Sequence, residues 1–158
     1  MKTIFAAIGA LAILPTAAAT EVAVTYSDDF AEELADNYGE REGKTLTEEI
    51  IEDLDRAFTK AGVEPARVDV TIVDAKPNRP TLEQLSDRPG LDAFRSISLG
   101  GMKLVGTAYD GEGNVIASQE YGWFENNLRD VVGSGVWTDA NRASRRFATK
   151  MAKQLSDS

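Results

Sequence analysis

The side chains on which most nucleophilic and metal-assisted catalysis depends are missing from this sequence. Its 158 residues include no histidine and no cysteine. Serine–histidine and cysteine–histidine catalysis, zinc sites built on these residues, and the haem and iron–sulfur sites that need them are therefore excluded. General acid–base catalysis could fall only to carboxylates, lysine or tyrosine. The acids cluster on predicted helix faces and turns, so we expect no catalytic residues, no cofactor and no enzymatic activity.

One group of acidic residues resembles a metal-binding loop in its spacing. Asp110, Glu112 and Asn114 occupy the first, third and fifth positions of an EF-hand calcium loop. The sixth position is Val115 where the loop needs glycine, and the twelfth is Tyr121 where it needs glutamate. Two predicted strands flank the segment, which favours a hairpin turn. We therefore expect no metal site and no specific calcium binding.

The clearest long pattern in the chain is a β-hairpin with a tight polar turn at 110–113. A four-residue turn makes Tyr109 face Asn114 and places Gly106 opposite Ala117, where two small residues let a helix approach closely. Side chains alternate between the faces of a strand. One face then carries Met102, Leu104, Gly106, Ala108, Val115, Ala117, Tyr121 and Trp123.

The other face of the hairpin is about half apolar, which is unusual for a face turned toward water. Its apolar members are Val105, Tyr109, Ile116 and Phe124. A contiguous exposed apolar patch marks an interaction site, so these four residues form a candidate partner surface. The alternative is that the segment 76–95 folds over this face and covers it.

The N-terminal segment 1–19 has the pattern of a secretory signal peptide. Lys2 gives a positive start, 4–14 is an apolar core, and the three alanines at 17–19 suit a cleavage site. We expect the mature chain to be a single domain, 20–158, that is periplasmic or secreted and has no transmembrane segment. The alternative is an uncleaved N-terminal anchor.

The formal net charge of −9 restricts the classes of partner. Nucleic acids and anionic membranes attract basic proteins, so we expect no nucleic-acid partner. The last predicted helix is locally basic and could bind an anion or an acidic partner, although a solvated helix face explains it more simply. Its cations are Arg142, Arg145, Arg146, Lys150 and Lys153.

Hydrophobic periodicity predicts an α+β fold with two layers. Strands are expected at 21–26, 67–74 and in the hairpin, and helices at 28–38, 43–62 and 139–155. A strand–helix–strand order favours a parallel crossover, whereas the hairpin is antiparallel. Together they predict a mixed sheet of about four strands with the helices packed on one face. The expected core includes Leu54, Phe58, Val70, Ile72, Leu104, Ala117, Phe147 and Met151.

Local signals also predict where the helices start. Ser27 precedes acidic residues and is expected to cap the first helix. Thr45 and Glu48 match a capping box for the second helix, and Thr138 is expected to cap the last.

The segment 76–95 has no periodicity, and its three prolines exclude a long helix or a central strand. Two interpretations remain open. One is a binding loop, and the other is a packed crossover held down by Leu82, Leu85, Leu91 and Phe94.

The two segments GGMKLVGTAYDGEGNVIASQEYGW and WTDANRASRRFATKMAKQL resemble small exported bacterial envelope proteins that are known only as domains of unknown function. Those proteins share a glycine-rich strand, an Asp-Gly type turn, a second strand and a terminal amphipathic helix. Many look like lipoproteins, whereas this chain lacks the cysteine that would carry the lipid. The resemblance implies an envelope location and supplies no catalytic residues.

These observations favour a non-catalytic periplasmic binding or assembly module of the cell envelope, with an unknown ligand. Its expected partner is an envelope protein or a second copy, bound through the outer sheet face. The alternatives are a small carboxylate-based hydrolase and a calcium- or anion-binding protein.

Overall fold

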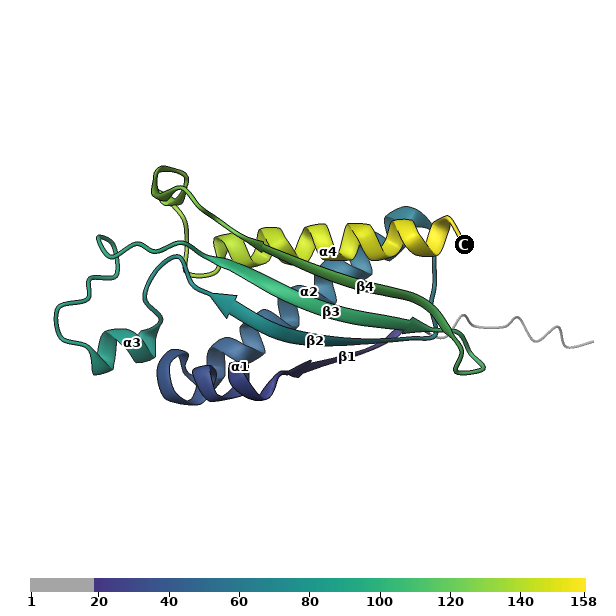
Figure 1. The fold of residues 1–158 in the computed structure, drawn as a ribbon, viewed down its shortest axis with the longest axis horizontal. Coiled ribbons are helices and arrows are strands. Elements are labelled where there is room, and N and C mark those ends of the chain that lie inside the picture. Colours follow the sequence, from purple (N-terminus) through teal and green to yellow (C-terminus); the bar gives the residue numbers. More distant parts are fainter. Residues whose placement is uncertain (1–18) are drawn as a thin grey trace, which may run out of the picture.

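A single mixed sheet organises the computed structural model, which describes residues 19–158 (Figure 1). The strands lie in the order β1-β2-β3-β4. β1 is parallel to β2, and the other two pairs are antiparallel. The strand bounds are β1 Glu21–Tyr26, β2 Arg67–Lys76, β3 Gly101–Tyr109 and β4 Val115–Phe124. The predicted α+β fold class is confirmed, whereas the predicted signal peptide, apart from Ala19, lies outside the described residues.

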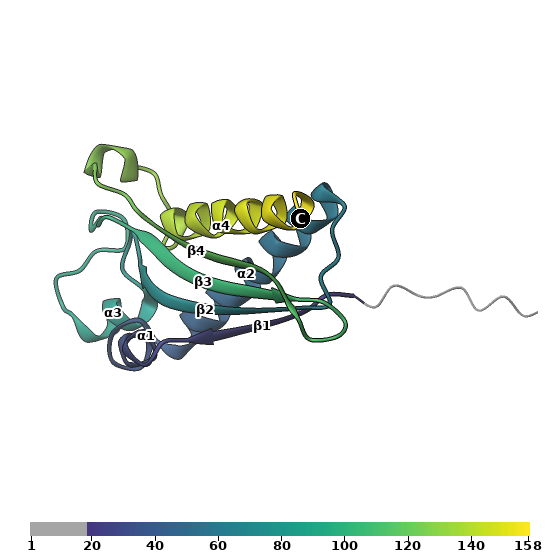
Figure 2. The same cartoon turned by 45° about the vertical axis from the view of Figure 1, so that its right-hand side comes forward.

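The helices form the second layer. Figures 1 and 2 show the two long helices, α2 and α4, on the same side of the sheet. Within residues 19–158, no helix is long and apolar enough to cross a membrane. The helix bounds are α1 Asp28–Glu33, the π-helix η1 Leu34–Tyr38, α2 Glu40–Ala61, α3 Leu82–Asp87, the 3₁₀ helix η2 Leu128–Val131 and α4 Thr138–Ser156.

The start of α1 was predicted correctly and the start of α2 was not. Ser27 caps α1, because its Oγ accepts a hydrogen bond from the Phe30 amide at 3.2 Å. Helix α2 begins at Glu40, so Thr45 lies inside the first turns and forms no capping box. Its hydroxyl donates to the carbonyl of Arg41, one turn earlier, at 3.3 Å. The chain re-enters a helix directly after the π-helix, and that continuity outweighs the local capping signal.

The hydrophobic core lies between the sheet and helices α2 and α4. Alternate residues of β2 and β3 face these helices, and the apolar side chains along one side of each helix face the sheet. All eight residues predicted for the core are buried, with at most 4% of any one exposed: Leu54, Phe58, Val70, Ile72, Leu104, Ala117, Phe147 and Met151.

The predicted hairpin register is wrong by two residues. Ala108 pairs with Ala117, and Tyr109 pairs with Val115 across a bulge. The cause is the turn chemistry at Asp110, whose carboxylate accepts hydrogen bonds from the backbone amides of residues 112 and 114, both at 2.9 Å. Asn114 therefore belongs to the turn. A shift of two residues keeps side chains on their faces, so the predicted faces hold except at the bulge. There Val115, predicted on the inner face, pairs with Tyr109 and is 59% exposed.

Gly106 lets α4 approach the sheet closely, as the sequence predicted, although it pairs with Gln119 and not with Ala117. A Cβ atom at position 106 would lie 2.6 Å from Cζ of Phe147 and 2.9 Å from Cε of Met151. Both side chains are fully buried and belong to α4. Neither can move away without disturbing the core.

We predict that Gly106→Val destabilises the fold by about 1–3 kcal/mol, because overpacking a tight core forces side chains out of their rotamers. Urea unfolding followed by circular dichroism measures the effect. Gly111→Ala is the matched control, since nothing lies within 4 Å of a Cβ atom at that turn position. Equal unfolding midpoints for the two variants would contradict the close packing.

Candidate binding surfaces

The outer face of the sheet, which turns away from α2 and α4, contains the predicted partner surface. Val105, Ile116 and Phe124 are 36–38% exposed, and Tyr109 is half-buried. Figures 1 and 2 show the segment between β2 and β3 beyond one end of the sheet, away from this face. These apolar side chains therefore remain accessible to a partner.

The four residues are spread along the strands and do not form one cluster. Phe124 pairs with Gly101 at the start of β3, whereas Tyr109 ends that strand, about 26 Å away at about 3.3 Å per residue. Cations lie over both rings. The guanidinium of Arg67 is 4.2 Å from the centre of the Tyr109 ring, and the Lys76 ammonium is 5.8 Å from that of Phe124.

A second apolar surface lies at the end of the molecule near Phe124, in the segments 77–100 and 125–136. Phe94 is 87% exposed and Leu82 is 65% exposed, so the predicted packed crossover held down by these residues is wrong. Figure 1 shows α3 and η2 at the same end. We call this set the apolar loop end; it comprises Leu82, Leu91, Phe94, Ile97, Leu99, Phe124, Leu128 and Val132, all at least 36% exposed.

Polar side chains hold the loop end in place. Asn78 is fully buried where β2 leaves the sheet. Its Oδ1 accepts the Asp139 amide at 2.8 Å, and its Nδ2 donates to the Asp139 carboxylate. Its backbone amide donates to Val136 at 2.7 Å, and its carbonyl accepts from Ser98 at 2.9 Å. Asn78 therefore joins both loop segments to the first turn of α4.

Asn78 also explains how α4 begins. The predicted cap, Thr138, is the first residue of the helix, and its hydroxyl accepts from the Gly135 amide at 2.8 Å. The cap position is Trp137, whose side chain gives no capping hydrogen bond. The amide of Asp139 is satisfied by Asn78, 61 residues away in the sequence. No local sequence signal could have indicated such a cap.

Arg79 binds the two segments of the loop end to each other. Its guanidinium donates to the carbonyls of Ser134 and Phe94. The Phe94 carbonyl is bonded to Arg79, and its amide donates to the Asp92 carboxylate at 2.8 Å. The exposed ring is therefore presented by a held backbone, which lowers the cost of ordering it when a partner binds.

A hollow of about 310 Å³ lies beneath this loop. Leu91, Ile97 and Leu99 form apolar parts of its wall, and Arg88 and Tyr38 contribute polar groups. Burial raises the pKa of the Tyr38 hydroxyl, and the nearby carboxylates raise it further. The phenol is therefore protonated at neutral pH and can donate a hydrogen bond into the hollow.

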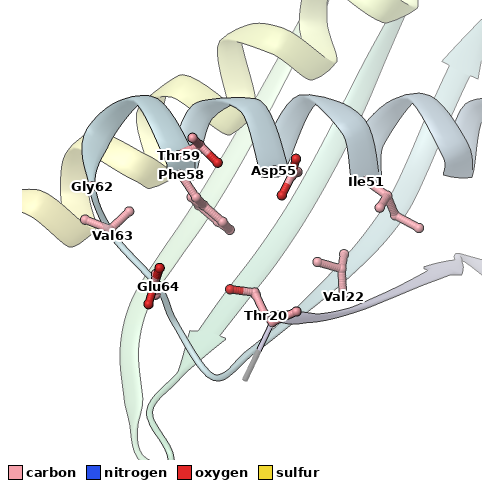
Figure 3. Close-up of a pocket in the computed structure, with 10 residues that line it drawn as sticks. Thr20, Val22, Ile51, Asp55, Phe58, Thr59, Gly62, Val63 and Glu64 are labelled. Atoms are coloured by element: carbon pink, nitrogen blue, oxygen red, sulfur yellow. The ribbon is translucent and has the colours of Figure 1, made fainter. Parts of the chain in front are cut away.

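Another hollow, of about 360 Å³, lies between the C-terminal half of α2 and the start of β1 (Figure 3). Ile51, Phe58 and Val63 line its apolar part. Asp55 and Glu64 also line it, and Figure 3 shows their carboxylates at separate points of the rim. A carboxylate-based hydrolase needs two acids that converge on one bond, and this arrangement does not provide them.

A buried carboxylate lies between α2 and α4. Asp53 is 3% exposed, and its Oδ1 accepts a hydrogen bond from Arg56 at 2.8 Å. Its Oδ2 and the hydroxyl of Ser144 on α4 are both buried without a partner. Burial raises the pKa of Asp53, and burial and the charge of Asp53 raise that of Glu49. Asp53 lines neither of the two hollows described above, and with Ser144 it lies between α2 and α4.

The segment that resembles a calcium loop is a closed turn. One oxygen of Asp110 accepts the two backbone amides, and the other accepts the Asn114 side chain at 3.0 Å. These hydrogen bonds lower the pKa of the Asp110 carboxyl, and the one from the Asn114 side chain has the largest effect. Over residues 19–158, no group of three or more acidic residues could hold a metal ion.

Comparison with known proteins places the chain in no family. No family model matches it, and no curated protein matches it. Among solved structures, it is similar to a minor lipoprotein from Acinetobacter baumannii, with 11% sequence identity and a TM-score of 0.36. The match covers 87% of this chain and 92% of that one. At that level of similarity, neither a family nor a shared function follows.

We predict that Asn78→Ala lowers the free energy of unfolding by about 3 kcal/mol, because it leaves the buried carboxylate and amide of Asp139 without these hydrogen bonds. Chemical denaturation measures the loss. Asn126→Ala, at an exposed position of the neighbouring loop, should change stability by less than about 0.5 kcal/mol. Similar losses in both variants would show that Asn78 does not anchor the loops.

Asp53 should make stability depend on pH. Its native pKa is raised above the unfolded value of about 3.9, so native Asp53 still holds a proton that the unfolded chain has lost. Stability therefore falls as pH rises from about 4 through the native pKa. Measured by urea unfolding between pH 4 and pH 7, the stability of the wild type relative to Asp53→Asn should decrease with rising pH. A constant difference would contradict the raised pKa.

Proposed function

We propose that this chain is a non-catalytic binding module of the cell envelope that engages a partner protein through the apolar loop end. The observation that carries the proposal is the exposure of Phe94, at 87%, on a loop whose backbone is fixed by Arg79 and Asn78. A large aromatic side chain on a rigid support is the kind of residue that anchors protein interfaces.

The composition of the loop end supports a protein partner. Eight large apolar side chains are exposed there, more than in any other part of the described chain. Over 77–100 and 125–136, four basic and five acidic side chains nearly cancel, although the whole chain has a net charge of −9. A patch that is apolar and locally neutral can be covered without leaving charges buried and unpaired.

The geometry also supports binding without catalysis. The carboxylates that line the hollow of Figure 3 lie at separate points of its rim, and Asp53 is sealed between helices. The predicted export to the envelope supplies the location, and the partner is then another envelope protein. Phe124, at the edge of the loop end, extends the same surface onto the sheet.

The test compares variants of the two apolar surfaces. Tagged mature wild type, Phe94→Asp and Ile116→Asp are cross-linked in envelope extract, and the captured proteins are identified by mass spectrometry. We expect Phe94→Asp to lose the captured partner, because a carboxylate replaces the ring at the centre of the contact. Ile116→Asp, on the sheet near the hairpin turn, should retain it.

Circular dichroism should show that both variants are folded, since both side chains are accessible to solvent. Loss of the partner in Ile116→Asp alone would move the contact to the outer sheet face. A wild type that captures nothing, and that light scattering shows to be monomeric, would contradict a binding module.

A further inference from the structure

Strand β4 forms an open edge of the sheet. Among the described strands, β4 pairs only with β3. It is ten residues long and contains no proline and no lysine, and its one charged side chain is that of Glu120. Natural proteins usually block exposed edges with short strands, lysine or proline, because an open edge can pair with another strand. Strand β4 is not short and has neither lysine nor proline, so its edge lacks these three features.

The register identifies the backbone groups that face the open edge. The amide of Glu125 donates to the carbonyl of Gly100 at 2.8 Å, so residues 123, 121 and 119 also pair inward toward β3. The amides and carbonyls of residues 118, 120, 122 and 124 then point outward. The Glu120 carbonyl accepts a hydrogen bond from the side chain of its neighbour Gln119, at 2.7 Å. This carbonyl faces the open edge, and the Gln119 side chain fills the place where a backbone amide of a further strand would donate.

Helix α4 places three cations beside this edge. Figures 1 and 2 show α4 running along β4. The Arg146 guanidinium is 4.6 Å from the centre of the Trp123 ring, and the Lys150 ammonium is 5.5 Å from that of Tyr121. We call Arg146, Lys150 and Lys153 the cationic ledge. All three are exposed, and none forms a salt bridge with any residue of 19–158.

The spacing of the cationic ledge matches that of a strand. Arg146 and Lys150 are four residues apart, which is about 6 Å along a helix axis. Side chains on one face of a strand recur every second residue, about 6.6 Å apart. Carboxylates at alternate positions of an added strand would therefore meet successive cations. A shallow hollow of about 570 Å³ continues the ledge, with Lys150 and Lys153 in its wall and Asp157 as its one acidic residue.

We propose that the β4 edge binds an extended acidic segment of a partner protein, which adds to the sheet as a fifth strand. Backbone hydrogen bonds would hold the segment to residues 118–124, and the cationic ledge would select acidic side chains at alternate positions. Pairing of two copies through β4 is disfavoured because it would bring two cationic ledges together. This site and its ligand are distinct from the apolar loop end and do not depend on it.

The test uses a synthetic ten-residue peptide in which glutamate alternates with valine or threonine. Isothermal titration calorimetry with the wild type should show saturable binding that weakens as salt is added. Hydrogen exchange should show new protection of the amides at 118, 120 and 122. The same peptide N-methylated on its pairing edge, and a peptide with lysine in place of glutamate, should not bind.

Variants of the protein test the charge selection. Arg146→Glu with Lys150→Glu should weaken binding of the acidic peptide at least tenfold, which is about 1.4 kcal/mol. The matched control, Lys44→Glu with Lys60→Glu on α2, makes the same change in net charge and should bind normally. Failure of the wild type to bind, equal loss in both double variants, or protection outside β4 would each overturn the proposal.

Discussion

The reciprocal pairing of Asn78 with the first turn of α4 connects parts of the chain that would otherwise be independent. One side-chain amide satisfies both the buried backbone amide and the buried carboxylate of Asp139, while its backbone joins Val136 and Ser98. A buried carboxylate is costly unless it is hydrogen-bonded. The position of α4 and the conformation of both loop segments therefore depend on one residue at the start of the first segment.

The sequence predicted the layers and the core well because these follow from periodicity. Alternation placed Val70 and Leu104 on the inner face of the sheet, and a helical stripe placed Phe147 against them. Errors arose where a particular side chain bonds the backbone. The Asp110 carboxylate extends the hairpin turn and shifts the register by two residues, and Asn78 replaces the local cap expected at Thr138.

The binding surfaces were predicted only in part. Alternation correctly placed Val105 and Ile116 on the outer face, but periodicity contains no information about the distance between residues at opposite strand ends. For the segment 76–95 the sequence left a binding loop and a packed crossover open, and the exposure of Phe94 and Leu82 excludes a crossover held down by these two residues. The sequence feature that indicates an exposed apolar loop is the absence of periodicity in a proline-rich segment with several large apolar residues. Such residues have no regular element that could bury them together.

The opposite edges of the sheet carry opposite charge. Helix α1, which with η1 carries five acidic residues, lies toward the β1 edge, and α4, which carries the cationic ledge, runs along β4 (Figures 1 and 2). These acids are Asp28, Asp29, Glu32, Glu33 and Asp36. These two clusters contribute an electric dipole directed across the strands. A charged partner would exert a torque on it before contact, at separations up to about 10 Å in 0.1 M salt. The molecule would thus rotate into a preferred orientation during encounter.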